Sequence, residues 1–272
     1  MDASVGEGKV LSVQDETRAV EPGIQELGSE NFIRDRLFKG TTSEVDRYRQ
    51  LVTGRPGLLA LLRYELTTMV LGGIPGAVGL ILRRFFYRSL FQEAGDGLVI
   101  GRNVVIRYPE QIRLGRKVVI DDYAVLDARG AGAEGLEIGN EVFIGRGTVI
   151  QSKYGPLTIG DHTSIGGYSV ICAMGRVTIG RLVRLAGGIQ LSGGMYHTDT
   201  PDVPIADQGL YTRGPIEIGN GTWIGMGALV LDGVSIGENC AIGAGTIVRE
   251  NVSSNSVIVP YQKLIGMPKG KR

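Results

Sequence analysis

The feature that most constrains the fold of this chain is a six-residue period of aliphatic residues near its C-terminal end. The period runs without interruption through Ile218, Ile224, Val230, Ile236, Ile242 and Val248. An α-helix repeats every 3.6 residues and a strand every two, so neither produces this spacing. A period of six is typical of a parallel β-helix, in which each hexapeptide supplies one short strand and one corner. The chain is therefore predicted to be mainly β.

The same pattern extends over residues 98–260, as pairs of an aliphatic residue and a glycine such as Ile100-Gly101 and Ile144-Gly145. Longer intervals in its first half predict small insertions at the corners. Glycine accounts for 43 of the 272 residues, about twice its ordinary share, which suits a fold with many tight corners. Three hexapeptides make a coil of about 18 residues, so eight or nine coils are expected.

The regions outside the repeat differ from it in charge and hydropathy. Residues 1–30 carry seven acidic and two basic side chains with few large apolar ones, and are expected to be a flexible acidic tail. Residues 31–97 contain ten basic and four acidic side chains and a dense apolar stretch, and are expected to be helical. Residues 261–272 form a basic C-terminal tail.

The apolar stretch permits two interpretations. Residues 66–82 carry no charge, but Gly72-Gly73-Ile74-Pro75-Gly76 breaks any helix at their centre. Two short helices followed by Arg83, Arg84 and Arg88 with aromatic neighbours suggest a membrane-associated hairpin that enters one leaflet and holds these arginines at the headgroups. The alternative is a helical cap on the end of the next domain, or a helix pair that joins subunits. The hairpin favours a peripheral or monotopic protein on the inner face of the cytoplasmic membrane.

Charge and cysteine usage exclude other classes. The 29 basic and 28 acidic residues nearly cancel, so the chain has no electrostatic basis for binding nucleic acid. Cys172 and Cys240 are isolated, which argues against a disulfide framework or a cysteine zinc site and fits a cytoplasmic location. Both thiols are expected to be buried.

The sequence RGPIEIGNGTWIGMGALVLDGVSIGENCAIGAGTIVRENV, residues 213–252, resembles the acetyl-CoA-dependent hexapeptide-repeat acetyltransferases. The resemblance is strongest to the maltose, galactoside and polysaccharide O-acetyltransferase branch and extends over residues 98–268. It implies a left-handed β-helix, a homotrimer with active sites between neighbouring subunits, and acetyl-CoA as co-substrate. With two histidines the chain lacks the three ligands of the zinc site in the carbonic-anhydrase branch, so no metal is expected.

One long insertion, residues 192–215, interrupts the repeat and contains His197. Insertions in solenoids usually carry function, and the resemblance places the catalytic base on His197. Imidazole chemistry agrees, because a neutral ring can take the proton of a sugar hydroxyl as it attacks a thioester. Asp199 is expected to orient the ring or to bind a sugar hydroxyl. His162 is expected to be an exposed corner residue, and Tyr168 stands near the place of the family's conserved-type Asn.

The resemblance also implies a cofactor-binding set in the last coils, along which pantetheine would lie extended. Carried over by position, the set comprises Met226, Ala244 and Arg249, with Trp223 as a wall of the cleft or as a packed corner residue. Lys263 matches a basic residue that would meet a CoA phosphate. Arg249-Glu250 replaces the family's usual Thr-Lys, which leaves the individual phosphate contacts open.

The sequence therefore predicts an acetyltransferase that acts on a hydroxyl of a saccharide by direct attack. If the helical segment binds the membrane, the acceptor is expected to be lipid-linked, as in surface polysaccharide assembly. Two alternatives remain: N-acetylation of a nucleotide-linked amino sugar, and a non-catalytic β-helix that serves as a scaffold at the membrane. The scaffold predicts no thiol release from acetyl-CoA and no effect of replacing His197.

Overall fold

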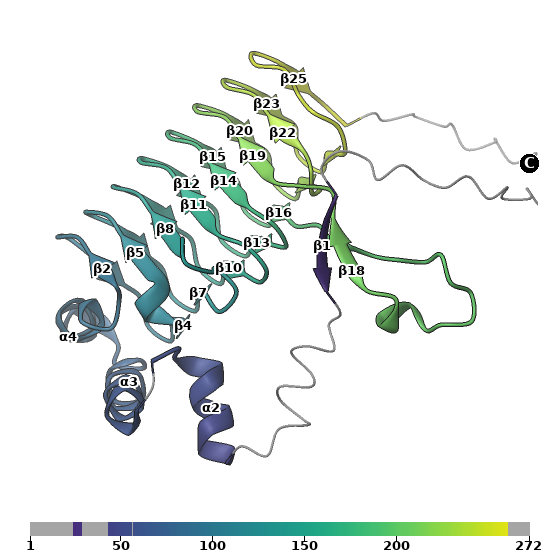
Figure 1. The fold of residues 1–272 in the computed structure, drawn as a ribbon. Helices are drawn as coiled ribbons and strands as arrows, with labels where there is room; N and C mark the ends of the chain where they lie inside the picture. Colours follow the sequence, from purple (N-terminus) through teal and green to yellow (C-terminus); the bar gives the residue numbers. More distant parts are fainter. Residues whose placement is uncertain (1–23, 29–42, 56, 261–272) are drawn as a thin grey trace, which may run out of the picture.

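Three parallel sheets form the walls of a β-helix, and each sheet takes one strand from each successive coil (Figure 1). The computed structural model describes residues 24–28, 43–55 and 57–260. The eight-stranded wall contains β3 (Val99–Ile100), β6 (Val119–Ile120), β9 (Phe143–Ile144), β12 (Ser164–Ile165), β15 (Arg184–Leu185), β20 (Trp223–Ile224), β23 (Ala241–Ile242) and β25 (Val257–Ile258).

The other two walls have seven strands each. One contains β4 (Val105–Arg107), β7 (Val125–Asp127), β10 (Val149–Ser152), β13 (Val170–Ala173), β16 (Gln190–Leu191), β21 (Leu229–Val230) and β24 (Ile247–Val248). The other contains β2 (Glu93–Ala94), β5 (Ile112–Leu114), β8 (Leu136–Ile138), β11 (Leu157–Ile159), β14 (Val177–Ile179), β19 (Ile216–Ile218) and β22 (Ser235–Ile236). A 3-10 turn, η1 (Pro109–Gln111), precedes β5.

The aliphatic residue of each hexapeptide points into the prism and stacks on its counterpart in the next coil. Ile144 pairs with Ile165, and Ile224 pairs with Ile242; all four are fully buried. The glycine that follows allows the coils to approach at the corners. A Cβ atom on Gly225 would lie 2.6 Å from the backbone nitrogen of Ala244. The parallel β-helix predicted from the six-residue period is confirmed.

The number of coils is smaller than the expected eight or nine. The walls contain seven, seven and eight strands, which correspond to about seven coils. The reason is coil length: Ile224 pairs with Ile242, 18 residues later, whereas Ile120 pairs with Ile144, 24 residues later. Insertions at the corners of the first coils therefore use residues that the ideal period assigns to further coils.

Three helices lie at the N-terminal end of the β-helix (Figure 1): α2 (Glu44–Val52), α3 (Leu58–Leu71) and α4 (Gly76–Arg88). The Ser43 hydroxyl caps α2 by accepting from the Asp46 amide at 3.2 Å. Residues 72–75 separate α3 from α4, and the Gly72 carbonyl accepts from the Asn103 amide at 2.8 Å. The helices are thereby joined to the first coil.

The inner sides of α3 and α4 are bound to the β-helix by buried polar contacts. The Tyr64 hydroxyl donates to the Ile106 carbonyl at 2.6 Å, and burial raises the pKa of Tyr64 to about 12. Arg83 is buried; its Nε donates to the Ile100 carbonyl at 2.9 Å and its Nη1 to the Ile74 carbonyl at 2.7 Å. The expectation that Arg83 lies among headgroups is therefore wrong, because the arginine closes the end of the first coil. In the described part of the chain, no helix is both long enough and apolar enough to cross a membrane.

A small antiparallel sheet extends from the side of the β-helix near its other end (Figure 1). It contains β1 (Gln25–Gly28), β18 (Leu210–Thr212) and β17 (Met195–Tyr196), with β18 in the middle. Residues 25–28 lie within the segment expected to be a flexible tail, and they form an ordered strand instead. The pairing with β18 satisfies their backbone groups.

Candidate active site

The inserted loop is held at its base by Asp232, which follows β21. One carboxylate oxygen, Oδ2, accepts from the Thr212 hydroxyl at 3.0 Å and from the Arg213 amide at 2.8 Å. Gly193, at the other end of the loop, packs so closely on this side chain that an added Cβ would lie 2.1 Å from the Asp232 Cβ. Asp232 and Thr212 are buried. The two ends of the loop therefore meet on one buried carboxylate.

Within the loop, a hairpin positions His197. Met195 of β17 pairs with Tyr211 of β18, and the His197 amide donates to the Gly209 carbonyl at 3.1 Å. The connection between these strands contains a 3-10 turn, η2 (Ile205–Asp207). The imidazole packs on the Tyr211 ring, with centroids 4.6 Å apart. The ring therefore has a defined orientation although it lies outside the repeat.

Two carboxylates flank the imidazole. His197 Nε2 lies 3.1 Å from both carboxylate oxygens of Glu26, in strand β1. His197 Nδ1 lies 3.8 Å from Asp199 Oδ2, which exceeds hydrogen-bonding distance. Sequence reasoning missed Glu26, because the contact joins residues 171 positions apart and no local motif marks it.

The other histidine is separate from this site. His162 occupies a corner with φ of 58°, and its Nδ1 lies 3.2 Å from Glu141 Oε2. Its partially exposed side chain agrees with the expectation of a surface corner residue. Tyr168 is exposed at another corner.

Three of the predicted cofactor residues gather on neighbouring coils. Trp223 begins β20, Met226 lies at the corner after it, and Ala244 lies at the same corner of the next coil, where the Gly245 amide donates to the Met226 carbonyl at 2.8 Å. All three side chains are exposed, so Trp223 does not pack in the core. Lys263 lies outside the described residues.

The remaining predicted residue, Arg249, lies at a different edge. It follows β24, at the end of the seven-stranded wall from which the His197 loop also departs after β16. Met226 and Ala244 lie at the opposite end of that wall, where the chain enters β21 and β24. A single chain thus presents His197 with Arg249 at one edge, and Met226 with Ala244 at the other.

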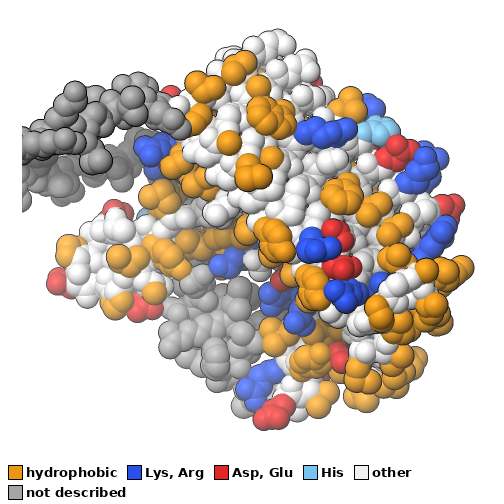
Figure 2. Space-filling view, turned by 180° about the vertical axis from the view of Figure 1, so that it is seen from behind, with side chains coloured by type: hydrophobic (Ala, Val, Ile, Leu, Met, Phe, Trp, Pro, Cys, Tyr) orange, Lys and Arg blue, Asp and Glu red, His pale blue; other side chains and the backbone are white. Residues whose placement is uncertain are grey.

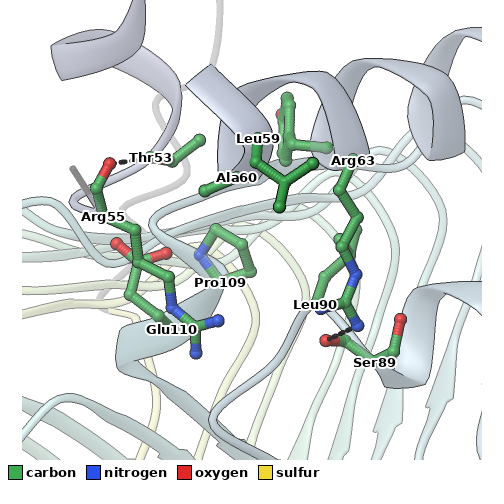
Figure 3. A pocket seen from close by; sticks show the side chains of 10 residues that line it. Thr53, Arg55, Leu59, Ala60, Arg63, Ser89, Leu90, Pro109 and Glu110 are labelled. Carbon is green, nitrogen blue, oxygen red and sulfur yellow. Dashed lines mark hydrogen bonds between the residues drawn. The ribbon is translucent and has the colours of Figure 1, made fainter. Parts of the chain in front are cut away.

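Two surface pockets lie away from His197. One, of about 220 Å³, is lined by residues of α3 and of the segments next to it (Figure 3). The other, of about 360 Å³, lies between Asp96, Arg116 and Glu141. His197 lines neither of them, so its ring faces open surface or a partner.

The cysteines and the metal question were examined across the described residues. Cys240 is buried, as expected, whereas Cys172 is only half-buried, and burial raises the pKa of the Cys172 thiol. No group of three His, Cys, Asp or Glu side chains in the described ranges has the arrangement of a metal site.

Comparison with known proteins identifies the repeat. The family model "Bacterial transferase hexapeptide (six repeats)" matches residues 215–250. A protein of Mycobacterium tuberculosis named "Probable acetyltransferase" is 35% identical over 124 residues, which are 46% of this chain and 41% of that protein. The chain thus spans about two fifths of that relative's length.

Two further proteins resemble longer parts of the chain. The dTDP-4-amino-4,6-dideoxy-D-glucose acyltransferase of Escherichia coli is 30% identical over 161 residues, which are 56% of this chain and 83% of that enzyme. The solved structure of a maltose O-acetyltransferase from Clostridium difficile is 19% identical, covers 74% of this chain and 83% of its own, and has a TM-score of 0.37. The family match and the coverage of the E. coli enzyme agree with the coiled fold. The chain therefore belongs to the family of hexapeptide-repeat acyltransferases.

Proposed function

We propose that this protein transfers an acetyl group from acetyl-CoA to a hydroxyl group of a saccharide. The observation that carries the proposal is the placement of His197. Its ring is displayed on an insertion outside the repeat and is held between Tyr211, Glu26 and Asp199. A structural role in the core would not require a loop clamped at its base and a ring flanked by two carboxylates.

The hydrogen-bonding pattern gives the two ring nitrogens different roles. A neutral imidazole that donates from Nε2 to Glu26 keeps its lone pair on Nδ1. Nδ1 then takes the proton of the acceptor hydroxyl while the hydroxyl oxygen bonds to the thioester carbon. When the carbon–sulfur bond breaks, the proton passes to the departing thiolate. The Glu26 carboxylate stabilises the transient imidazolium. Such a base contributes about 10² to 10⁴ in rate.

Asp199 then has a different task from orienting the ring. Its carboxylate lies on the Nδ1 side, 3.8 Å away, with room for a bound group between them. We assign Asp199 to accept a hydrogen bond from a second hydroxyl of the acceptor. Charge-assisted hydrogen bonds of this kind fix a sugar in one orientation.

The corner that carries Met226 and Ala244 fits the pantetheine arm of acetyl-CoA. Gly188, Gly227 and Gly245 lie at this corner in successive coils, and a Cβ on any of them would meet nothing within 4 Å. The track is therefore open to a narrow extended chain, and Trp223 stands beside it. When bound, acetyl-CoA supplies the activated acyl group; Arg249 and Lys263 are proposed to contact its phosphates.

The separation of the two edges supports a homotrimer. His197 lies at one edge of the seven-stranded wall and the proposed cofactor track at the other. A second copy placed alongside would bring its track against the first copy's His197. Threefold packing repeats this contact and closes the ring.

An amine acceptor is the second candidate. The E. coli relative named for a dTDP-linked amino sugar is covered over 83% of its length. The same base would take a proton from an attacking amine, so the site chemistry alone does not separate the two acceptors. A panel of saccharide hydroxyl acceptors and nucleotide-linked amino sugars separates them, with mass spectrometry locating the acetyl group.

The test of the proposal is thiol release from acetyl-CoA by the full chain with a competent acceptor. His197→Ala should lower turnover by about 10² or more, because the base is removed, while acetyl-CoA binding by calorimetry stays unchanged. Wild-type turnover should rise with pH through the neutral range, since only the neutral ring accepts a proton. His162→Ala is the matched control and should retain turnover.

Two results would contradict this role. If His197→Ala retained turnover, another group would be the base. If no acceptor in the panel gave thiol release above the rate of hydrolysis, the scaffold alternative would replace the enzyme.

A further inference from the structure

The outer face of α3 and α4 is apolar and uncovered. Its large side chains contact no other described element and are mostly exposed, for example Leu59 at 80%, Met69 at 73% and Phe85 at 70%. The other members of this outer face are Leu58, Leu62, Leu66, Val70, Val78, Leu80, Ile81 and Phe86. Figure 2 shows hydrophobic side chains gathered at this end of the molecule, at lower right.

These side chains are not a displaced part of the core. The inner sides of the helices already pack on the first coil through Tyr64, Leu71, Arg83 and Tyr87, all buried. The outer face is thus a second apolar surface on the same two helices. Soluble monomers rarely expose contiguous apolar surface of this kind unless it binds something.

The charges along the outer face are positive. Arg63, Arg84 and Arg88 are exposed on the two helices, and among the described residues Arg84 makes neither a hydrogen bond nor an ion pair. The acidic side chain of the pair, Glu65, accepts from the Tyr48 hydroxyl at 2.6 Å. An apolar face with an arginine border complements the interface of an anionic bilayer, where acyl chains lie below negative headgroups.

A pocket of about 220 Å³ adjoins the outer face (Figure 3). Leu59 belongs to both, and Arg55 and Arg63 line the pocket beside it. The acidic residue of the lining, Glu110, is engaged by the Gly54 amide. Two guanidinium groups at the border of an apolar face suit a phosphate group attached to a lipid.

We propose that the outer face of α3 and α4 docks on an anionic lipid bilayer, with both helices in the interface plane and a lipid phosphate at Arg55 and Arg63. Amphipathic helices of this kind bury their apolar side about 5–10 Å below the headgroups. The face lies at the end of the β-helix opposite the small sheet that holds His197 (Figure 1), so docking leaves the inserted loop accessible. The inference does not depend on the proposed reaction.

Cosedimentation of the full chain with vesicles tests this docking. Vesicles of phosphatidylcholine with one quarter phosphatidylglycerol should bind the protein, and pure phosphatidylcholine vesicles should bind it at least tenfold more weakly. The variant that replaces Leu59, Met69, Ile81 and Phe85 by Ser should lower binding at least tenfold. The control variant replaces Leu182, Ile247, Val257 and Val259, exposed on the β-helix, and should bind like the wild type.

Charge is tested separately with Arg63→Gln combined with Arg84→Gln, which should weaken binding and reduce its salt dependence. The docking proposal is overturned if the full chain ignores anionic vesicles or if the Ser variant binds as well as the control variant. It is also overturned if light scattering shows that the Ser variant loses subunits, because the face would then join copies of the chain. None of these measurements requires turnover, so their failure is distinct from failure of the acetyl-transfer proposal.

Discussion

At the scale of single residues, Glu26 is the group whose role the structure makes testable. Its carboxylate holds His197 Nε2 from a strand outside the repeat. Glu26→Gln keeps an acceptor but loses the charge that stabilises imidazolium. Hydrogen bonds to charged groups contribute about 1.5–3 kcal/mol, so turnover should fall at least tenfold. The measurement is thiol release, with the melting temperature in parallel.

Glu26→Ala should be slower than Glu26→Gln, since it also removes the acceptor that orients the ring. The melting temperature should hardly change, because Glu26 is exposed. Gln25→Ala, in the same strand with an exposed side chain, is the control for β1 itself. Turnover that increases in Glu26→Gln would show instead that this carboxylate blocks the base.

His197 and Glu26 also mark what the sequence can and cannot reveal about the site. His197 is predictable because it interrupts a strict period, and an interruption is visible in one segment of sequence. Glu26 is not, because its role arises from an antiparallel pairing with β18 that no spacing encodes. Asp232 is hidden for a different reason, since it occupies an ordinary corner of the repeat.

At the scale of elements, Asp232 anchors the inserted hairpin to the β-helix. Asp232→Ala leaves the buried Thr212 hydroxyl and the Arg213 amide without their acceptor. Each buried donor left unsatisfied costs about 1–3 kcal/mol. We expect faster hydrogen exchange at Arg213 and His197 and a loss of turnover. Asp202→Ala, exposed in the same loop, should change neither. Unaltered exchange in Asp232→Ala would show that the hairpin holds itself.

The elements also show how far a pattern carries. The period of six identifies every wall strand from Ile218 onward, because each inward aliphatic residue faces its counterpart 18 residues later, as Ile224 faces Ile242. It overestimates the number of coils, because insertions at corners leave the inward residues unchanged. Composition identifies α3 and α4 as apolar helices but does not reveal which side of each faces the β-helix. Arg83 decides that question by hydrogen-bonding to the first coil.

At the scale of the whole molecule, the distribution of residues over two edges predicts that two copies share each site. His197→Ala removes the base, and Ala244→Glu places a carboxylate in the proposed cofactor track. Each variant alone should be inactive. If the site lies between copies, a trimer that mixes the variants contains some contacts with an intact base from one copy and an intact track from the next.

The yield of such mixing follows from the geometry. In random trimers of equal amounts, a given contact combines both intact halves in one of four arrangements, so about a quarter of wild-type turnover should return. The variants are unfolded and refolded together, or coexpressed with two tags and purified on both, and thiol release is compared with that of each variant treated alone. Mixed trimers as inactive as their parents would place both halves in one chain. Recovery requires that His197 of one copy reach the Ala244 corner of its neighbour, which a monomer cannot provide.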